Sequence, residues 1–257
     1  LYWNARLGDY YGMDASVAAN VRVAYEESGE IAPKLLRRFG ITEGNRQTLL
    51  LGMFMSQLVN PYKYTIYPGF YESCGPEGEK LIEYVEKEWK RQPHVGELPL
   101  DIVQQVIEHG DRAVPAVDAA GEKVTRNKDE FERLRNDMHC YREFAYAFHF
   151  KVKAAKLVLD YQWGKNMKDL EEAVPLMEQS LEHYRKLADL TKEHMLDRNI
   201  KYACFHYELD GKEYMDDLGQ LNVVFLSEVM TGITRHGENC WYIMKKSWRT
   251  SSPILLC

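Results

Sequence analysis

The chain has 257 residues, 45% of them hydrophobic and 28% charged, as in an ordinary globular protein with one large domain or two modest ones. Its formal net charge of −6 disfavours a nucleic-acid partner, because such a partner requires a basic surface. No run of about 18 apolar residues occurs, so no transmembrane helix and no membrane partner are expected. Five scattered cysteines without a CxxC pair predict neither a disulfide framework nor a metal site, and no cofactor motif occurs.

Periodic apolar residues and helix-stop signals predict several helices in the first half of the chain. They cover about 14–27, 31–39, 45–58, 77–89 and 100–119. Gly29 is expected to end the first of these, and Pro33 lies in the first turn of the second. In the last of them, Ile102, Val106, Ala113 and Val117 are expected to face the core, and Pro115 to bend the helix.

Residues 60–76, here called the aromatic segment, interrupt this helical pattern. Five aromatic residues alternate there with prolines and glycines: Tyr62, Tyr64, Tyr67, Phe70 and Tyr71. Proline removes backbone donors and glycine relaxes φ, so the segment is not expected to be helical. Two interpretations stay open, namely a binding surface on a helical scaffold or a set of rings that only covers the core.

Other residues extend this candidate surface. Arg46 opens the helix that leads into the aromatic segment, where it would hydrogen-bond a polar ligand or simply be an exposed residue beside a helix cap. The complete set of candidate ligand-binding residues is Arg46, Tyr62, Tyr64, Tyr67, Phe70, Tyr71, Glu72 and Trp89. If the chain binds carbohydrate, at least two of the rings are expected to face solvent in one concave region, with Arg46 or Glu72 at its edge.

The strongest periodicity predicts an antiparallel helical hairpin over 128–162 and 168–196. The first stripe contains Phe131, Leu134, Met138, Tyr141, Ala145, Phe148, Val152, Ala155 and Leu159. The second contains Leu170, Val174, Met177, Leu181, Tyr184, Ala188, Thr191 and Met195. Asn127 and Glu130 predict a capping box, Gly164 a stop, and Pro175 either a helix start or a kink.

Residues 201–257 differ from the rest, because Asp210-Gly211 within a partly alternating stretch predicts a β-hairpin. We therefore expect an all-α, multi-helix bundle with a long helical hairpin. Its helical domain covers 1–200, and a small C-terminal extension over 201–257 packs on the same core. The first residues, Leu1-Tyr2-Trp3, resemble the interior of a protein, so the chain is expected to be a fragment of a longer one.

No catalytic residue is identified, because the glycine-rich nucleotide motifs, nucleophile elbows and paired metal motifs are absent. Acidic residues near the predicted β-hairpin, such as Glu208 and Glu213, are of the type that hydrolyses glycosides. Paired acids near turns are common, however, and an all-helical enzyme with an unrecognised site is the weakest of the interpretations.

Three groups of residues carry a family resemblance. They are RLGDYYG (6–12) with SGEIAP (28–33), NRQTL (45–49) through NP (60–61) and YPG (67–69), and EAVPL (172–176) through LEHYRKL (181–187). Together they resemble helical regions downstream of the catalytic domain in large bacterial polysaccharide-degrading proteins, glycoside-hydrolase-like chains of the α-glucuronidase type. The resemblance covers most of residues 1–200 and brings no catalytic residue with it.

The resemblance implies a helical region beside a (β/α)₈ barrel, a carbohydrate substrate, and a periplasmic or extracellular setting. We therefore expect a helical accessory domain of a carbohydrate-active protein, with an oligo- or polysaccharide and a neighbouring catalytic domain as partners. The aromatic segment would then contact sugar, since pyranose rings stack on aromatic faces. The alternative is an all-helical interaction or scaffold module that binds no small molecule.

Overall fold

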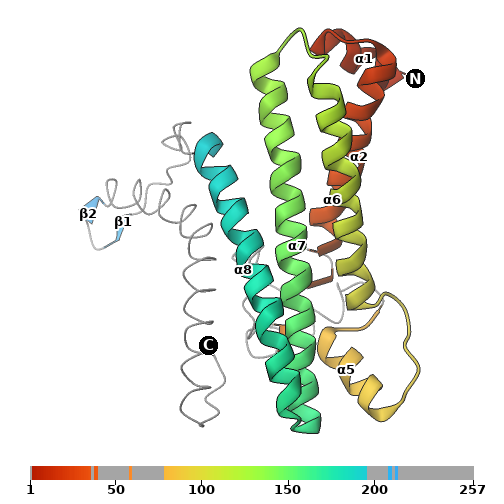
Figure 1. Ribbon diagram of the computed structural model, residues 1–257, viewed down its shortest axis with the longest axis vertical. Coiled ribbons are helices and arrows are strands. Elements are labelled where there is room, and N and C mark those ends of the chain that lie inside the picture. Colours follow the sequence, from red (N-terminus) through yellow and green to blue (C-terminus); the bar gives the residue numbers. More distant parts are fainter. Residues whose placement is uncertain are drawn as a thin grey trace. The chain divides into compact units, whose positions relative to one another are not determined.

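The computed structural model describes residues 2–35, 38–39, 58–59, 78–195, 208–209 and 212–213. Helices account for most of these residues (Figure 1). They are α1 (Tyr2–Tyr11), α2 (Ala15–Leu35), α5 (Leu81–Lys90), α6 (Pro99–Gly121), α7 (Lys128–Gly164) and α8 (Met167–Met195). The predicted all-α class is confirmed. None of the helices in these ranges has the length and apolarity that crossing a bilayer requires.

The chain divides into two compact units, Leu1–His183 and Tyr184–Cys257, and the division falls inside α8. In the second unit, strands β1 (Glu208–Leu209) and β2 (Lys212–Glu213) pair antiparallel. They flank the predicted Asp210-Gly211 turn, whose own two residues lie outside the described ones. The predicted division into domains at residue 200 stays a prediction.

Helix α2 replaces the two helices predicted over 14–27 and 31–39, so that prediction is wrong. The helix continues through Gly29 and Pro33. Its buried positions are Ala18, Val21, Ala24, Ser28, Ile31 and Leu35, which are spaced three or four residues apart and form one unbroken stripe against α6. Burial of a Val or Ile side chain is worth about 1.5–3 kcal/mol, and several such gains outweigh the helix-breaking tendencies of one glycine and one proline.

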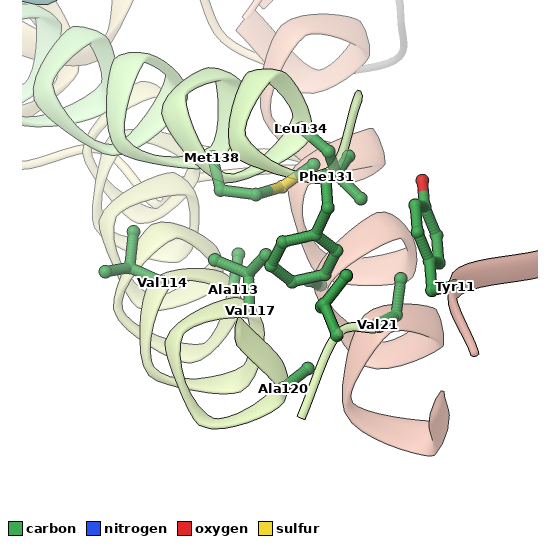
Figure 2. Close-up of a cluster of buried hydrophobic side chains, with 11 residues drawn as sticks. Tyr11, Val21, Ala113, Val114, Val117, Ala120, Phe131, Leu134 and Met138 are labelled. Atoms are coloured by element: carbon green, nitrogen blue, oxygen red, sulfur yellow. The ribbon is translucent and has the colours of Figure 1, made fainter. Parts of the chain in front are cut away.

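Helices α2, α6 and α7 lie side by side and enclose the main core (Figure 1). The positions predicted to face inward from α6, namely Ile102, Val106, Ala113 and Val117, are all buried. Figure 2 shows the Phe131 ring pointing from α7 into the space between Val21 of α2 and Val117 of α6. The Tyr11 ring meets the Phe131 ring edge to face, with centroids 5.3 Å apart, which joins the end of α1 to the same core.

The start of α7 differs from the predicted capping box. Asn127 has a left-handed conformation, with φ of 49°, and its side chain makes no cap hydrogen bond. The Asn127 amide instead donates to the backbone oxygen of Tyr10 at 2.9 Å. The backbone N–H groups of Thr125 and Arg126 donate to the oxygen of Tyr11, each at 3.0 Å. The capping prediction is therefore wrong, because these residues connect α7 to the end of α1.

The predicted helical hairpin is confirmed within the first unit. The Ser180 hydroxyl of α8 donates to the backbone oxygen of Ala147 in α7 at 2.7 Å, and His183 Nδ1 lies 2.7 Å from Glu143 Oε2. The contact three residues later in α8 is made to a residue four positions earlier in α7, so the two helices run antiparallel. Helix α8 begins at Met167, because the Asn166 side chain accepts the backbone N–H of Lys168.

Pro175 therefore lies inside α8 and does not mark its start. The predicted stripe of α7 is buried at Phe131, Leu134, Met138, Ala145, Phe148, Val152, Ala155 and Leu159. Tyr141 is the exception, since 37% of its surface is exposed. A tyrosine can pack its ring on an apolar face and keep its hydroxyl in water.

Candidate functional site

Most of the predicted site residues lie outside the residues that the structure describes. This applies to Arg46, Tyr62, Tyr64, Tyr67, Phe70, Tyr71 and Glu72. The predicted helix over 45–58 lies outside as well, apart from Leu58 at its end. Trp89 is described, and the geometry around it is the part of the candidate surface that can be built from its residues.

Trp89 lies next to the end of α5 and meets a second tryptophan, Trp163, which lies next to the end of α7. The two ring centroids are 6.4 Å apart, and the ring planes are inclined by 28°. Trp89 is 55% exposed and Trp163 is 39% exposed. We call these two residues the tryptophan pair. Their indoles form an aromatic surface open to solvent, assembled from positions 74 residues apart in the sequence.

The turn between α7 and α8 fits closely against Trp89. A Cβ atom added at Gly164 would lie 3.2 Å from the Trp89 ring, so the glycine leaves room for the indole against the backbone. The next residue, Lys165, takes the left-handed conformation that ends α7, with φ of 54°. Gly164, predicted as the stop of the helix, is its last residue, and its lack of a side chain serves the contact with Trp89.

A lysine borders the tryptophan pair. The Lys90 ammonium lies 5.9 Å from the centroid of the Trp163 ring, a cation–π distance, and also forms an ion pair with Glu86 one turn earlier in α5. The lysine thus brings hydrogen-bond donors beside an aromatic face. This combination of an aromatic plane and a polar edge is one that can hold a sugar ring.

Helix α5 is held in place by a buried carboxylate. Glu79, only 3% exposed, accepts hydrogen bonds from Lys87 Nζ at 2.8 Å and from the backbone N–H of Val95 at 2.7 Å. Its other oxygen lies 2.7 Å from His94 Nδ1. We call Glu79, Lys87, His94 and Val95 the Glu79 clasp. It connects the residues before α5 with those after it, so it fixes the helix that carries Trp89.

The electrostatics of the Glu79 clasp follow from these contacts. Burial alone raises the pKa of the Glu79 carboxyl, but the hydrogen bonds from Lys87, His94 and the Val95 N–H outweigh it and hold the pKa below its ordinary value. The carboxylate therefore stays ionised at neutral pH. The Tyr84 ring stacks on the His94 imidazole, with centroids 4.4 Å apart, and covers this side of the clasp.

A second set of charges connects α5 to α7. Lys156 of α7 forms ion pairs with Glu88 of α5 at 2.7 Å and with Asp160 at 2.9 Å. Burial alone lowers the pKa of Lys156, but hydrogen bonds to Glu88 and Asp160 raise it above the ordinary lysine value. Because Glu88 immediately precedes Trp89, this ion pair also fixes the position of the tryptophan pair.

Two further groups of ion pairs in the first unit connect neighbouring helices. Asp118 of α6 pairs with Arg135 at 2.6 Å and His139 at 3.2 Å of α7, and hydrogen bonds from these two residues lower its pKa despite the opposing effect of burial. Glu27 of α2 is held in the same way by His109 and Arg112 of α6. Among the described residues, no group of three or more His, Cys, Asp or Glu could hold a metal ion.

Sequence reasoning singled out Trp89 but missed Trp163 and the Glu79 clasp. A signal for Trp163 was present, because it follows Leu159 by four residues and so extends the apolar stripe of α7 to the very end of the helix. At that position no further helix turn covers it, and the ring stays exposed. No comparable signal pointed to Glu79, whose partners lie 8, 15 and 16 residues further along the chain.

Comparison with solved structures gives the family context. The chain is similar to an enzyme of glycoside hydrolase family 138 (GH138) that targets the pectin rhamnogalacturonan II. Sequence identity is 60% and the TM-score is 0.72, and the similarity covers 92% of this chain and 34% of that enzyme. The chain thus spans about a third of the length of the solved enzyme it matches. No family model and no curated protein matches the chain.

The chain is thus similar to part of a glycoside hydrolase. This similarity supports the broader part of the resemblance noted from sequence and supports a carbohydrate-active protein. It does not support the α-glucuronidase type in particular, because the matched enzyme is a member of GH138.

Proposed function

We propose that this chain is the helical part of a glycoside hydrolase that acts on a pectic polysaccharide, and that it contacts the glycan without supplying the catalytic acids. The observation that carries the proposal is the 60% identity, over 92% of the chain, to a GH138 enzyme that targets rhamnogalacturonan II. At that identity two proteins share a fold, and the substrate class of one is a reasonable first hypothesis for the other.

The residues of this chain favour catalytic carboxyl groups located elsewhere in the protein. The sequence contains no motif of a catalytic site. In the first unit, Glu27, Glu79 and Asp118 are tied to Arg, Lys or His partners and serve to join helices. A glycosidase needs two carboxyl groups facing one sugar ring, one of them free to give up a proton. We therefore place the catalytic acids in a neighbouring domain of the same protein.

Glycan contact is assigned to aromatic residues. The aromatic segment, with Tyr62, Tyr64, Tyr67, Phe70 and Tyr71, stays the candidate from sequence, flanked by Arg46 and Glu72. The exposed ring of Trp89 supports an aromatic contact surface, since it shows that one of the candidate rings faces solvent. A polysaccharide substrate also implies a periplasmic or extracellular setting in a bacterium, where such polymers are encountered.

The reaction is tested on the protein that carries this chain. It is incubated with purified rhamnogalacturonan II and, in parallel, with a soluble β-glucan of neutral sugars, and released sugars are separated by anion-exchange chromatography. We expect release from rhamnogalacturonan II alone. Folded protein that releases nothing from rhamnogalacturonan II or from other pectic fractions would overturn the proposed substrate class.

The contribution of the aromatic segment is tested separately with Tyr67→Ala and Tyr71→Ala. Each is expected to weaken binding to pectic oligosaccharides by about 1–2 kcal/mol while leaving the free energy of unfolding nearly unchanged. Tyr141→Ala is a matched control, since Tyr141 is a partly exposed tyrosine of α7, outside the aromatic segment. Strong destabilisation of both variants, with no change in glycan affinity, would instead favour the interaction-module alternative.

A further inference from the structure

We infer that the tryptophan pair is a glycan-binding platform, at which a pyranose ring of a pectic oligosaccharide stacks on indole with the Lys90 ammonium at its edge. This inference rests on the proposed function, because it takes the ligand class from it. It goes further in naming a site, a second tryptophan and a polar contact that the aromatic segment does not include.

The exposure of the pair is the first argument. The aromatic residues that fill the core, such as Tyr11, Phe131 and Phe148, are each at most 2% exposed. Trp89 and Trp163 keep much of their surface in water although they lie against each other. Contact between two rings covers only part of each indole, and the remaining surface is available to a ligand.

The rigidity of the pair is the second argument. Trp89 is confined by the backbone at Gly164, and its helix is fixed by the Glu79 clasp and by the Lys156–Glu88 ion pair. Trp163 lies one residue before the end of α7. Rings that are held before the ligand arrives lose little conformational freedom on binding, which favours affinity.

The surroundings of the pair favour sugar over an apolar protein partner. Exposed residues next to the pair in the sequence include the polar Lys90, Arg91, Gln162 and Lys165, and the apolar Met167 further along is exposed as well. The core of a protein interface depletes lysine and extends over a larger apolar area. Two ring faces with donors at the margin match a sugar instead, because its C–H face is apolar while its hydroxyl or carboxylate oxygens accept hydrogen bonds at the rim.

The experiment measures binding of pectic oligosaccharides to the full chain by isothermal titration calorimetry. Trp163→Ala and Trp89→Ala are expected to raise the Kd by about tenfold, as the loss of an aromatic stacking contact does. Lys90→Gln should raise it by a smaller factor. Trp3→Ala is the matched control, because Trp3 is 64% exposed but lies in α1, and it should leave the Kd unchanged.

Two variants guard against a loss of folding. Trp163→Phe and Trp89→Phe keep an aromatic face and should retain most of the affinity, and thermal unfolding followed by circular dichroism reports whether each alanine variant is folded. If folded alanine variants bind as the parent chain does, the platform is refuted while the proposed function stands. An equal loss of binding in the Trp3→Ala control and in the Trp89→Ala and Trp163→Ala variants would also refute the platform.

The outcomes separate the two proposals. If the protein that carries this chain degrades rhamnogalacturonan II but the chain binds no pectic oligosaccharide, the inference of a platform fails and the tryptophan pair is a contact to another part of the protein. If neither degradation nor binding is seen with any pectic fraction, the proposed function itself fails. Binding that depends on both indoles supports the platform.

Discussion

Replacement of Glu79 by glutamine tests whether the clasp holds α5 by charge. The substitution keeps the shape of the side chain and removes its negative charge. Glu79 accepts three hydrogen bonds of 2.7–2.8 Å. A hydrogen bond to a charged group is worth about 1.5–3 kcal/mol and a neutral one about 0.5–1.5, so each bond weakens by roughly 1 kcal/mol. We expect the Glu79→Gln variant to lose about 2–3 kcal/mol of unfolding free energy at pH 7.

The stability difference between the parent protein and the Glu79→Gln variant should depend on pH. The folded-state pKa of Glu79 is depressed, so its stabilisation is present above the unfolded pKa of about 4.3 and is lost as the pH falls through the folded pKa. The difference between parent and variant should therefore be full at pH 7 and shrink at pH 3. Urea unfolding followed by circular dichroism measures both values.

Glu86→Gln is the control for this experiment, because Glu86 pairs with Lys90 on the surface of the same helix. An exposed pair of this kind contributes about 0–1 kcal/mol, so the control should unfold almost as the parent does. Two results would show that the clasp does not act through its charge. One is a Glu79→Gln destabilisation below about 1 kcal/mol at pH 7, and the other is a destabilisation at pH 3 as large as that at pH 7.

The other predictions concern the core, a turn and a thiol. Phe148→Ala should cost about 3–5 kcal/mol in urea unfolding, because the ring is 2% exposed and packs against Phe39 and Phe144; a cost under 1 kcal/mol would contradict the α7 packing. Gly78→Ala should destabilise by about 1–3 kcal/mol, since φ is 145° and the new Cβ would lie 2.4 Å from the Glu97 oxygen. Gly29→Ala, a helical glycine with no atom within 4 Å of the added Cβ, should instead stabilise by about 0.5–1 kcal/mol. Burial raises the pKa of the Cys140 thiol to about 12, so iodoacetamide at pH 8 should alkylate it far more slowly in native than in urea-unfolded protein, as peptide mass spectrometry would show; equal rates would contradict its burial.

The helical hairpin could be predicted from sequence because its information is local and repeated. Successive members of the apolar stripes in α7 and α8 are three or four positions apart, and the short turn at 165–166 allows only an antiparallel return. The boundaries of α2 could not be predicted in the same way. Gly29 and Pro33 are local stop signals, and the burial against α6 that overrides them depends on residues more than 60 positions away.

At the candidate site, too, single residues could be predicted from sequence but their contacts with distant residues could not. Exposed aromatic residues can be selected from sequence as candidates, as Trp89 was. Their arrangement cannot, because the Trp89–Trp163 contact depends on α5 packing against the end of α7. Likewise Asn127 has the sequence of a helix cap, yet Tyr10, 117 residues away, provides the acceptor that its side chain uses.

The geometry of the tryptophan pair follows from charges that lie outside it. Trp89 reaches Trp163 only if α5 keeps its angle to α7, and Lys156 fixes that angle through Glu88, the residue before Trp89. The Glu79 clasp fixes the beginning of the same helix and the residues after it. Two ionic contacts thus help to position an apolar surface. Lys87 in the last turn of α5 pairs with Glu79 before the helix, and the adjacent Glu88 pairs with Lys156 of α7. An aromatic platform on so short a helix needs this support, because a helix of that length has little stability of its own.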